Sequence, residues 1–267
     1  MTARAFLIRG LLAGLLAGIA VFIVAFTVGE PQVQAAIDLE ETNSAAEAPA
    51  EESEAGHSHE SEEAHSHEDE GAVVSRSTQR TWGLLTASVG VGTALGGIVA
   101  LVAAGVVGRI GRWSPGQSTA FVALAGFVAV GLVPFLKYPA SPPAVGNGET
   151  IGSRTVEYFA YLVISILAAV VATVVAQRLW RDRGTYVAVV SGVALYLAVV
   201  VVAGVLMPTV NELGDFPADI LWYFRRAAII TQATMWAGIG VLLVGMVGKL
   251  HREASATTER RRLAASL

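Results

Sequence analysis

Four histidines close together carry the clearest coordination chemistry in this sequence. They form two His-x-His units, His57-Ser-His59 and His65-Ser-His67, inside an acidic stretch over residues 43–70. In an extended chain the side chains at i and i+2 point the same way, so each unit offers two imidazoles to one metal ion. Imidazole suits Co, Ni, Cu and Zn, and its affinity follows the Irving–Williams order. The segment is therefore predicted to capture divalent cations without selecting one, and to lose affinity below about pH 6 as imidazole is protonated.

The alternative interpretation of this stretch is a solvated acidic linker whose histidines are incidental. Its composition of Glu, Ser, Ala, Asp and His gives it little to bury, which predicts disorder under both interpretations. The clustering of four of the five histidines within residues 57–67 favours metal capture.

Three carboxylates beside apolar stretches are candidate cation ligands at an outer mouth: Glu30, Glu157 and Glu212. Proline breaks a helix and frees carbonyls, and the helix C-terminus is the negative end of its dipole, so broken helix ends with nearby acids favour cations. Plain helix termination is the alternative explanation of the prolines. For Glu157 the alternative is an ion pair with Arg154, three residues earlier on the same helix. The prolines near the ends of outward-running helices are Pro31, Pro134 and Pro208.

Further polar residues lie at the expected membrane boundary. Arg225 and Arg226 open the last apolar stretch, where they snorkel to the interface or pair with Glu212, Asp215 or Asp219. Gln232, two turns further on, is either a site residue or a hydrogen-bonding contact between helices. The Pro- and Gly-rich loop over residues 137–154 either folds back over a pore mouth or simply connects two helices.

The composition of the chain indicates which structural elements hold these residues in place. The chain has 267 residues, of which 54% are hydrophobic and 15% charged, and it contains no cysteine, which excludes disulfides and thiolate metal sites. Six apolar stretches reach the roughly 20 residues that a helix needs to cross a hydrocarbon core of about 30 Å. Backbone groups find no water in lipid, so each stretch must be helical. We expect an all-α integral membrane protein, a bundle of about six transmembrane helices with a disordered acidic, histidine-containing extracytoplasmic loop. The six spans are residues 5–28, 82–107, 118–136, 156–178, 185–207 and 225–248.

Basic residues predict the orientation. With the N-terminus inside, the inner segments hold 12 of the 18 Lys and Arg residues, and the outer segments hold 6. Cytoplasmic loops carry the excess of Lys and Arg, so both termini are expected in the cytoplasm of a multi-pass plasma-membrane protein. The acidic, histidine-bearing loop is then outside. The expected parts are a first transmembrane helix (1–28), the outer loop (29–80), a five-helix bundle (81–250) and a cytoplasmic basic tail (251–267).

The first span has two interpretations. Arg4, Arg9, the apolar run and the VQA before Ala36 resemble a secretory signal peptide with a cleavage site. However, the 18-residue run is long for a signal peptide, which favours a retained helix. Glycines at four-residue spacing would let a neighbouring helix approach closely, although glycine is also generally common in membrane helices. These glycines are Gly10, Gly14 and Gly18, with a second pair at Gly92 and Gly96.

Three segments resemble the CbtA family of predicted cobalt-transporter membrane subunits. They are GEP (Gly29 to Pro31), PFLKYPASPPAVGNGETIGSR (Pro134 to Arg154) and FPADILWYFRRAAIITQATMW (Phe216 to Trp236). The resemblance covers most of the chain outside the acidic insert. It implies cobalt uptake linked to cobalamin supply, beside a small single-span, histidine-bearing partner, CbtB. It assigns no site residues.

The leading hypothesis is therefore a permease subunit for uptake of cobalt, or nickel, with the outer loop capturing the ion. The alternative is a non-transporting metal sensor or assembly partner of a transporter. The sequence lacks the G-x-x-x-x-G-K-[ST] and H-E-x-x-H motifs, so we expect no enzyme and no cofactor other than the captured metal, cobalt first. Expected partners are membrane lipids, the CbtB-like subunit and further copies of the chain, but no nucleic acid.

Overall fold

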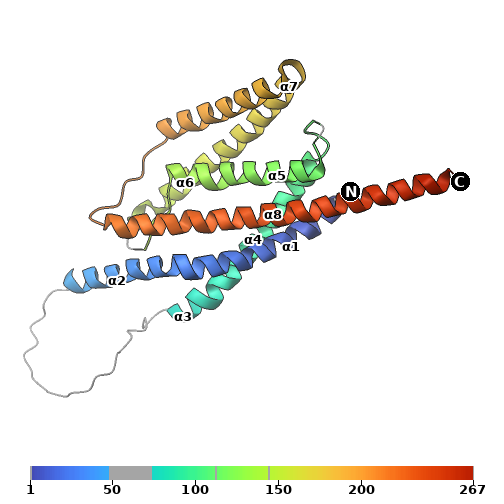
Figure 1. Ribbon diagram of the computed structural model, residues 1–267. Coiled ribbons are helices and arrows are strands. Elements are labelled where there is room, and N and C mark those ends of the chain that lie inside the picture. Colours follow the sequence, from blue (N-terminus) through green and yellow to red (C-terminus); the bar gives the residue numbers. More distant parts are fainter. Residues whose placement is uncertain (1, 48–73, 112, 144, 267) are drawn as a thin grey trace, which may run out of the picture.

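The computed structural model describes residues 2–47, 74–111, 113–143 and 145–266, and all regular structure within them is helical (Figure 1). This confirms the prediction of an all-α membrane protein. Within these described ranges, the segments without α, π or 3₁₀ geometry are short connections at the two ends of the bundle. The elements are α1 (Ala3–Val24), η1 (Ala25–Gly29), α2 (Glu30–Glu47), α3 (Arg76–Thr78), η2 (Gln79–Gly83), α4 (Leu84–Val106), α5 (Pro115–Gly126), η3 (Phe127–Leu132), α6 (Val133–Lys137), η4 (Gly148–Thr150), α7 (Ile151–Leu206) and α8 (Ala218–Ala265).

Five continuous helical stretches among the described residues are long and apolar enough to cross a membrane, whereas the sequence predicts six spans. The difference lies in α7, which has 56 residues and would be about 84 Å long if it were straight. It is bent at Gly184, whose φ of 80° and ψ of 174° belong to a region that only glycine adopts readily. The two arms of α7 therefore correspond to the predicted spans 156–178 and 185–207.

The two arms of α7 pack against each other as an antiparallel hairpin (Figure 1). The Tyr161 hydroxyl donates to the Val200 carbonyl at 3.0 Å, and the hydroxyls of Ser165 and Tyr196 lie 2.9 Å apart. These buried polar groups satisfy one another where water is absent. Most of the remaining apolar surface of α7 is exposed, as expected for a helical hairpin that faces lipid.

Helices α1 and α4 make an exceptionally close contact through glycines. A Cβ on Gly92 would lie 2.5 Å from the Gly14 carbonyl oxygen and 3.0 Å from the Gly18 Cα. Gly10 and Gly96 meet in the same way further along the pair. The predicted glycine faces on these two helices therefore meet in one contact, which packs α1 against α4.

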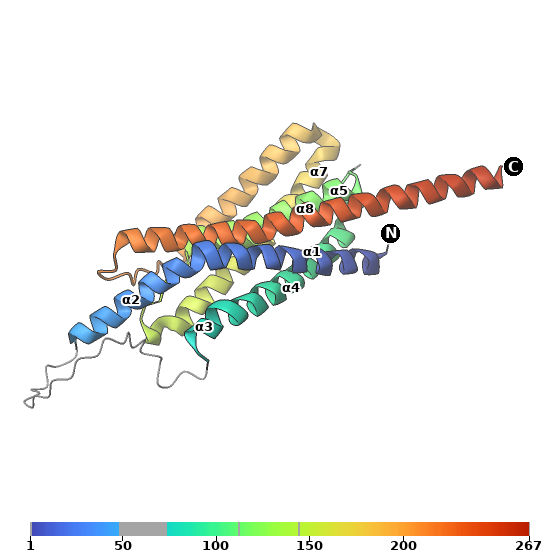
Figure 2. The ribbon, with the colours of Figure 1, turned by 60° about the horizontal axis from the view of Figure 1, so that its bottom comes forward.

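Helix α8 forms the centre of the bundle with α1, α4 and α5 (Figures 1 and 2). Trp236 is 5% exposed and packs against Gly126 so closely that a Cβ there would force its ring to shift. Helix α5 begins sharply because Ser114 and Gln117 form a capping box around Pro115. The buried core on these helices comprises Phe6, Ala13, Ala17, Val21, Val99, Ala100, Ala103, Val122, Ala123, Met235, Trp236, Ile239, Leu243 and Val247.

The first helix does not end near residue 28, where the sequence places the start of a disordered loop. It continues through the π-helical turn η1 into α2, which reaches Glu47. Pro31 lacks an N–H and its ring crowds the preceding turn, and the wider π turn just before it accommodates both effects without ending the helix. The same arrangement recurs where η3 precedes Pro134 at the start of α6. Proline at these two positions therefore reshapes a helix instead of terminating it.

Both termini lie at the same end of the bundle in Figures 1 and 2. The end of α2 and the start of α3, the described segments on either side of the acidic stretch, lie at the opposite end. We call this opposite end the loop end. It also contains the connection from α6 to α7 and the connection from α7 to α8.

Candidate functional site

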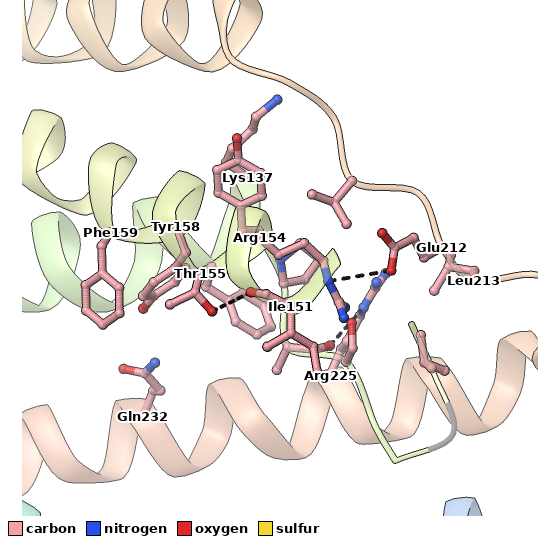
Figure 3. Close-up of a pocket in the computed structure, with 17 residues that line it drawn as sticks. Lys137, Ile151, Arg154, Thr155, Tyr158, Phe159, Glu212, Leu213, Arg225 and Gln232 are labelled. Atoms are coloured by element: carbon pink, nitrogen blue, oxygen red, sulfur yellow. Dashed lines mark hydrogen bonds and ion pairs between the residues drawn. The ribbon is translucent and has the colours of Figure 1, made fainter. Parts of the chain in front are cut away.

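A cavity of about 560 Å³ opens at the loop end of the bundle (Figure 3). Its walls come from the end of α6, the connection that follows it, the first turns of α7, the connection after α7 and the first turns of α8. The cavity therefore brings together two of the three segments that resemble the CbtA family.

The end of α6 and the connection after it are joined to the residues that follow α7 by two hydrogen bonds. The Lys137 ammonium donates to the Met207 carbonyl at 3.1 Å, and the Tyr138 hydroxyl donates to the Pro208 carbonyl at 2.9 Å. Helix α7 stops at Leu206 because a residue before proline avoids the helical conformation. The carbonyls left at this helix end are the negative end of its dipole, which suits a lysine.

Arg154 and Glu212 form the polar centre of the cavity wall (Figure 3). Arg154 Nε lies 3.5 Å from Glu212 Oε2, and Arg154 Nη2 donates to the Asn147 carbonyl at 3.0 Å. The Asn147 N–H donates to Glu212 Oε2 at 2.9 Å. This N–H first, then the Thr150 hydroxyl and the positive charge of Arg154, lower the pKa of Glu212. Gly146, at a φ of 108°, lies so close to the guanidinium that a Cβ there would collide with it.

The predicted ion pair between Arg154 and Glu157 is not formed. Three-residue spacing makes such a pair available, but the guanidinium turns to Glu212 and the Asn147 carbonyl, which offer it two acceptors. One carboxylate oxygen of Glu157 is buried and has no hydrogen-bond partner. Its negative charge adds to burial in raising the pKa of the Tyr138 hydroxyl. Glu157 itself does not line the cavity.

Arg225 reaches the cavity from α8, where its Nε donates to the Ala140 carbonyl at 3.4 Å. The guanidinium of Arg226 lies over the Tyr223 ring, 4.8 Å from its centroid. Neither arginine forms the predicted ion pair with Glu212, Asp215 or Asp219, because each is already placed against a carbonyl or an aromatic face. Gln232, two turns after Arg225, lines the same cavity.

Glu30 lies away from this cavity and pairs with Arg76 at 2.7 Å. The pair joins the start of α2 to the start of α3, beside Arg80 over the Phe26 ring. The three candidate acids are thus not brought into one cluster, and the described residues contain no group of three or more His, Asp or Glu placed to hold a metal ion. His57, His59, His65 and His67 lie outside the described residues.

Sequence reasoning did not find the convergence of Lys137, Tyr138 and Arg225 on one cavity. Their hydrogen-bond partners lie 70 to 85 residues away in the chain. The available signal was the proline-rich loop after residue 137, for which folding back over a mouth was one of two expectations. In the structure this loop contacts the segment after α7 and the start of α8 through hydrogen bonds.

The helical bundle, its apolar lipid-facing surface and a polar cavity at one end define a multi-pass helical membrane protein. The family described as "Probable cobalt transporter subunit (CbtA)" matches residues 3–247. The chain belongs to this family, as the three resembling segments predict. Neither the comparison with curated proteins nor that with solved structures gives a match.

Proposed function

We propose that this protein is the multi-pass membrane subunit of a cobalt-uptake system and that its acidic outer segment captures the ion. The family match over nearly the whole chain carries the proposal, since it describes a cobalt transporter subunit. The word subunit implies partners, and the resemblance nominates a small single-span, histidine-bearing protein of the CbtB type. Association with further copies of the same chain is compatible with the exposed apolar hairpin of α7.

The proposed orientation places both termini in the cytoplasm. The two termini share one end of the bundle, and the inner segments carry twice as many Lys and Arg residues as the outer ones. The residues flanking the histidine stretch lie at the opposite end, which would be outside. An inward divalent cation then gains about 4.6 kcal/mol per 100 mV of membrane potential, twice the single-charge figure.

Capture is assigned to His57, His59, His65 and His67, and the outer-mouth acids Glu30, Glu157 and Glu212 are proposed as further ligands. Glu157 is the strongest of these three, because its buried carboxylate oxygen lacks a partner, whereas Glu30 and Glu212 are each paired with an arginine. A carboxylate oxygen is a ligand that divalent cations accept, and an unsatisfied buried one gains from binding.

The test is accumulation of radioactive cobalt in cells, with the chain and a CbtB-type partner expressed together. Accumulation above that of cells without the chain is expected; equal accumulation would refute the transport role and leave the sensor or assembly role. A variant with His57, His59, His65 and His67 replaced by Asn isolates capture. It should lose uptake at low cobalt and keep uptake at high cobalt, and unchanged uptake at low cobalt would refute capture alone.

Orientation is tested separately by cysteine labelling. The method suits this chain because the natural sequence contains no cysteine. Single cysteines at Val74 and at Ser266 should react with a membrane-impermeant maleimide in intact cells only at residue 74. Labelling of residue 266 and not of residue 74 would refute the proposed orientation and indicate the opposite one.

A further inference from the structure

The cavity at the loop end has an excess of positive charge. Lys137, Arg154 and Arg225 line it, and Glu212 is the single carboxylate among its lining residues. Glu212 already accepts the Asn147 N–H and pairs with Arg154, so its charge is committed. Lys137 and Arg225 therefore bring positive charge to the cavity that no carboxylate among its lining residues pairs with.

Arg225 has unused hydrogen-bonding capacity. A guanidinium carries five N–H donors, and among the described residues the hydrogen bond of Arg225 is the long one to the Ala140 carbonyl. The Arg225 side chain is half-buried beside the connection that follows α6. Losing water there is costly for an ion without a counter-charge. Its planar fork fits the two oxygens of a phosphate or carboxylate.

The remaining wall supplies a polar group and an apolar surface. Gln232 lies two turns from Arg225 on α8 and adds an amide that can donate (Figure 3). Phe135 and Phe159 line the cavity as well. The charged residues lie toward the loops, whereas Phe159 and Gln232 lie on the side away from them (Figure 3). The ligand that fits is thus an anionic group, with room for an apolar portion beside it.

We propose that this cavity binds an oxyanion, a phosphate or carboxylate group held by Arg225 with Lys137 and Arg154 around it. Two sources share this chemistry: the phosphate of an anionic lipid headgroup and a soluble phosphate or polycarboxylate. The proposal goes beyond cobalt transport and does not depend on it.

The experiment uses the full-length chain in lipid nanodiscs. In phosphatidylcholine discs, binding of radiolabelled inorganic phosphate and of citrate is measured; in discs with phosphatidylglycerol, retention of that lipid is measured by native mass spectrometry. Saturable binding of either soluble anion, or selective retention of phosphatidylglycerol, is expected for the natural chain and identifies the source.

Arg225→Gln should weaken that binding at least tenfold. Arg226→Gln is the matched control, since the neighbouring arginine is exposed against Tyr223 and does not line the cavity; it should bind as the natural chain does. Arg225→Lys, which keeps the charge, should bind between the two and shows that loss in Arg225→Gln is not misfolding. Absence of anion binding by the natural chain, or equal binding by the Arg225→Gln and Arg226→Gln proteins, would overturn the proposal. Cobalt uptake is not a readout here, so failure of transport and failure of anion binding are separate results.

Discussion

The contact between α1 and α4 gives the sharpest quantitative prediction. Two glycines of α4 have different surroundings, since Gly92 lies against α1 and Gly90 lies in open space. A Cβ on Gly92 would lie 2.5 Å from the Gly14 carbonyl oxygen, whereas a Cβ on Gly90 would have nothing within 4 Å. Gly92→Ala and Gly90→Ala are therefore the same chemical change on the same helix, two residues apart. The first tests the helix contact, and the second measures what a methyl group does to the helix alone.

The magnitude follows from the geometry. Real Cβ atoms essentially never come within 3.0 Å of another heavy atom, so α1 and α4 must separate by about 0.5 Å at this position. Such overpacking costs about 1–3 kcal/mol, because backbones and neighbours shift from their best contacts. The gain in helix propensity from Gly to Ala, at most about 1 kcal/mol, is common to both variants and cancels in the comparison. The Gly92→Ala protein should thus be less stable than the Gly90→Ala protein by about 1–3 kcal/mol.

The assay is reversible unfolding in mixed detergent micelles with increasing dodecyl sulfate, followed by circular dichroism and tryptophan fluorescence. A difference of 1.4 kcal/mol appears as about a tenfold change in the unfolding equilibrium constant. Should the two variants unfold within about 0.5 kcal/mol of each other, the close helix contact at Gly92 is wrong.

Three further predictions use the same assay or a pH series. Gly184→Ala should destabilise the chain by about 1–3 kcal/mol through backbone strain alone, because no atom lies within 4 Å of the new Cβ; an unchanged stability would show that the bend does not need glycine. Tyr196→Phe should cost about 0.5–1.5 kcal/mol, since it removes the buried hydrogen bond with Ser165, and a neutral result would refute that bond. Folding lowers the pKa of Glu212, so its contribution is present above the unfolded pKa and is lost as pH falls through the folded value. Protease resistance of the loop after residue 137 should accordingly fall in acid, and Glu212→Gln should lower it at neutral pH and flatten this dependence; the same acid profile in both proteins would rule out Glu212.

The membrane spans were predictable from sequence because the thickness of a bilayer dictates their length. The count differed only at α7, where hydropathy marks two spans and the backbone runs through the bend at Gly184 as one helical element. The helical segment α2 was missed for the opposite reason. Its acidic composition suggested a solvated loop, although Glu, Ala, Gln and Leu are strong helix formers and extend a helix that already exists.

The residues of the cavity were individually visible in the sequence, but their partners were not. Helical spacing puts Glu157 within reach of Arg154, yet it does not reveal that the loop brings Asn147 and Glu212 to the same guanidinium. Local periodicity predicts neighbours along one helix. Whether Arg154 contacts a local or a distant partner depends on how a loop without periodicity is folded. Here the backbone of Asn147 contacts both side chains, because its N–H donates to Glu212 and its carbonyl accepts from Arg154.

Six basic residues lie at the loop end, although the charge bias of the chain places twice as many Lys and Arg at the other end. Their contacts give a reason for keeping them there. A base on the proposed outer side weakens the orientation signal, so each one retained should have a local structural role. The contacts agree: two make ion pairs, two donate to backbone carbonyls that end or follow a helix, and two lie over aromatic rings. Removing one of the two ring-stacked arginines should therefore strengthen the orientation bias, whereas removing a carbonyl-bound or ion-paired base should loosen the cavity or the α2–α3 connection. The six contacts are Arg76 with Glu30, Arg154 with Glu212, Lys137 with Met207, Arg225 with Ala140, Arg80 with Phe26 and Arg226 with Tyr223.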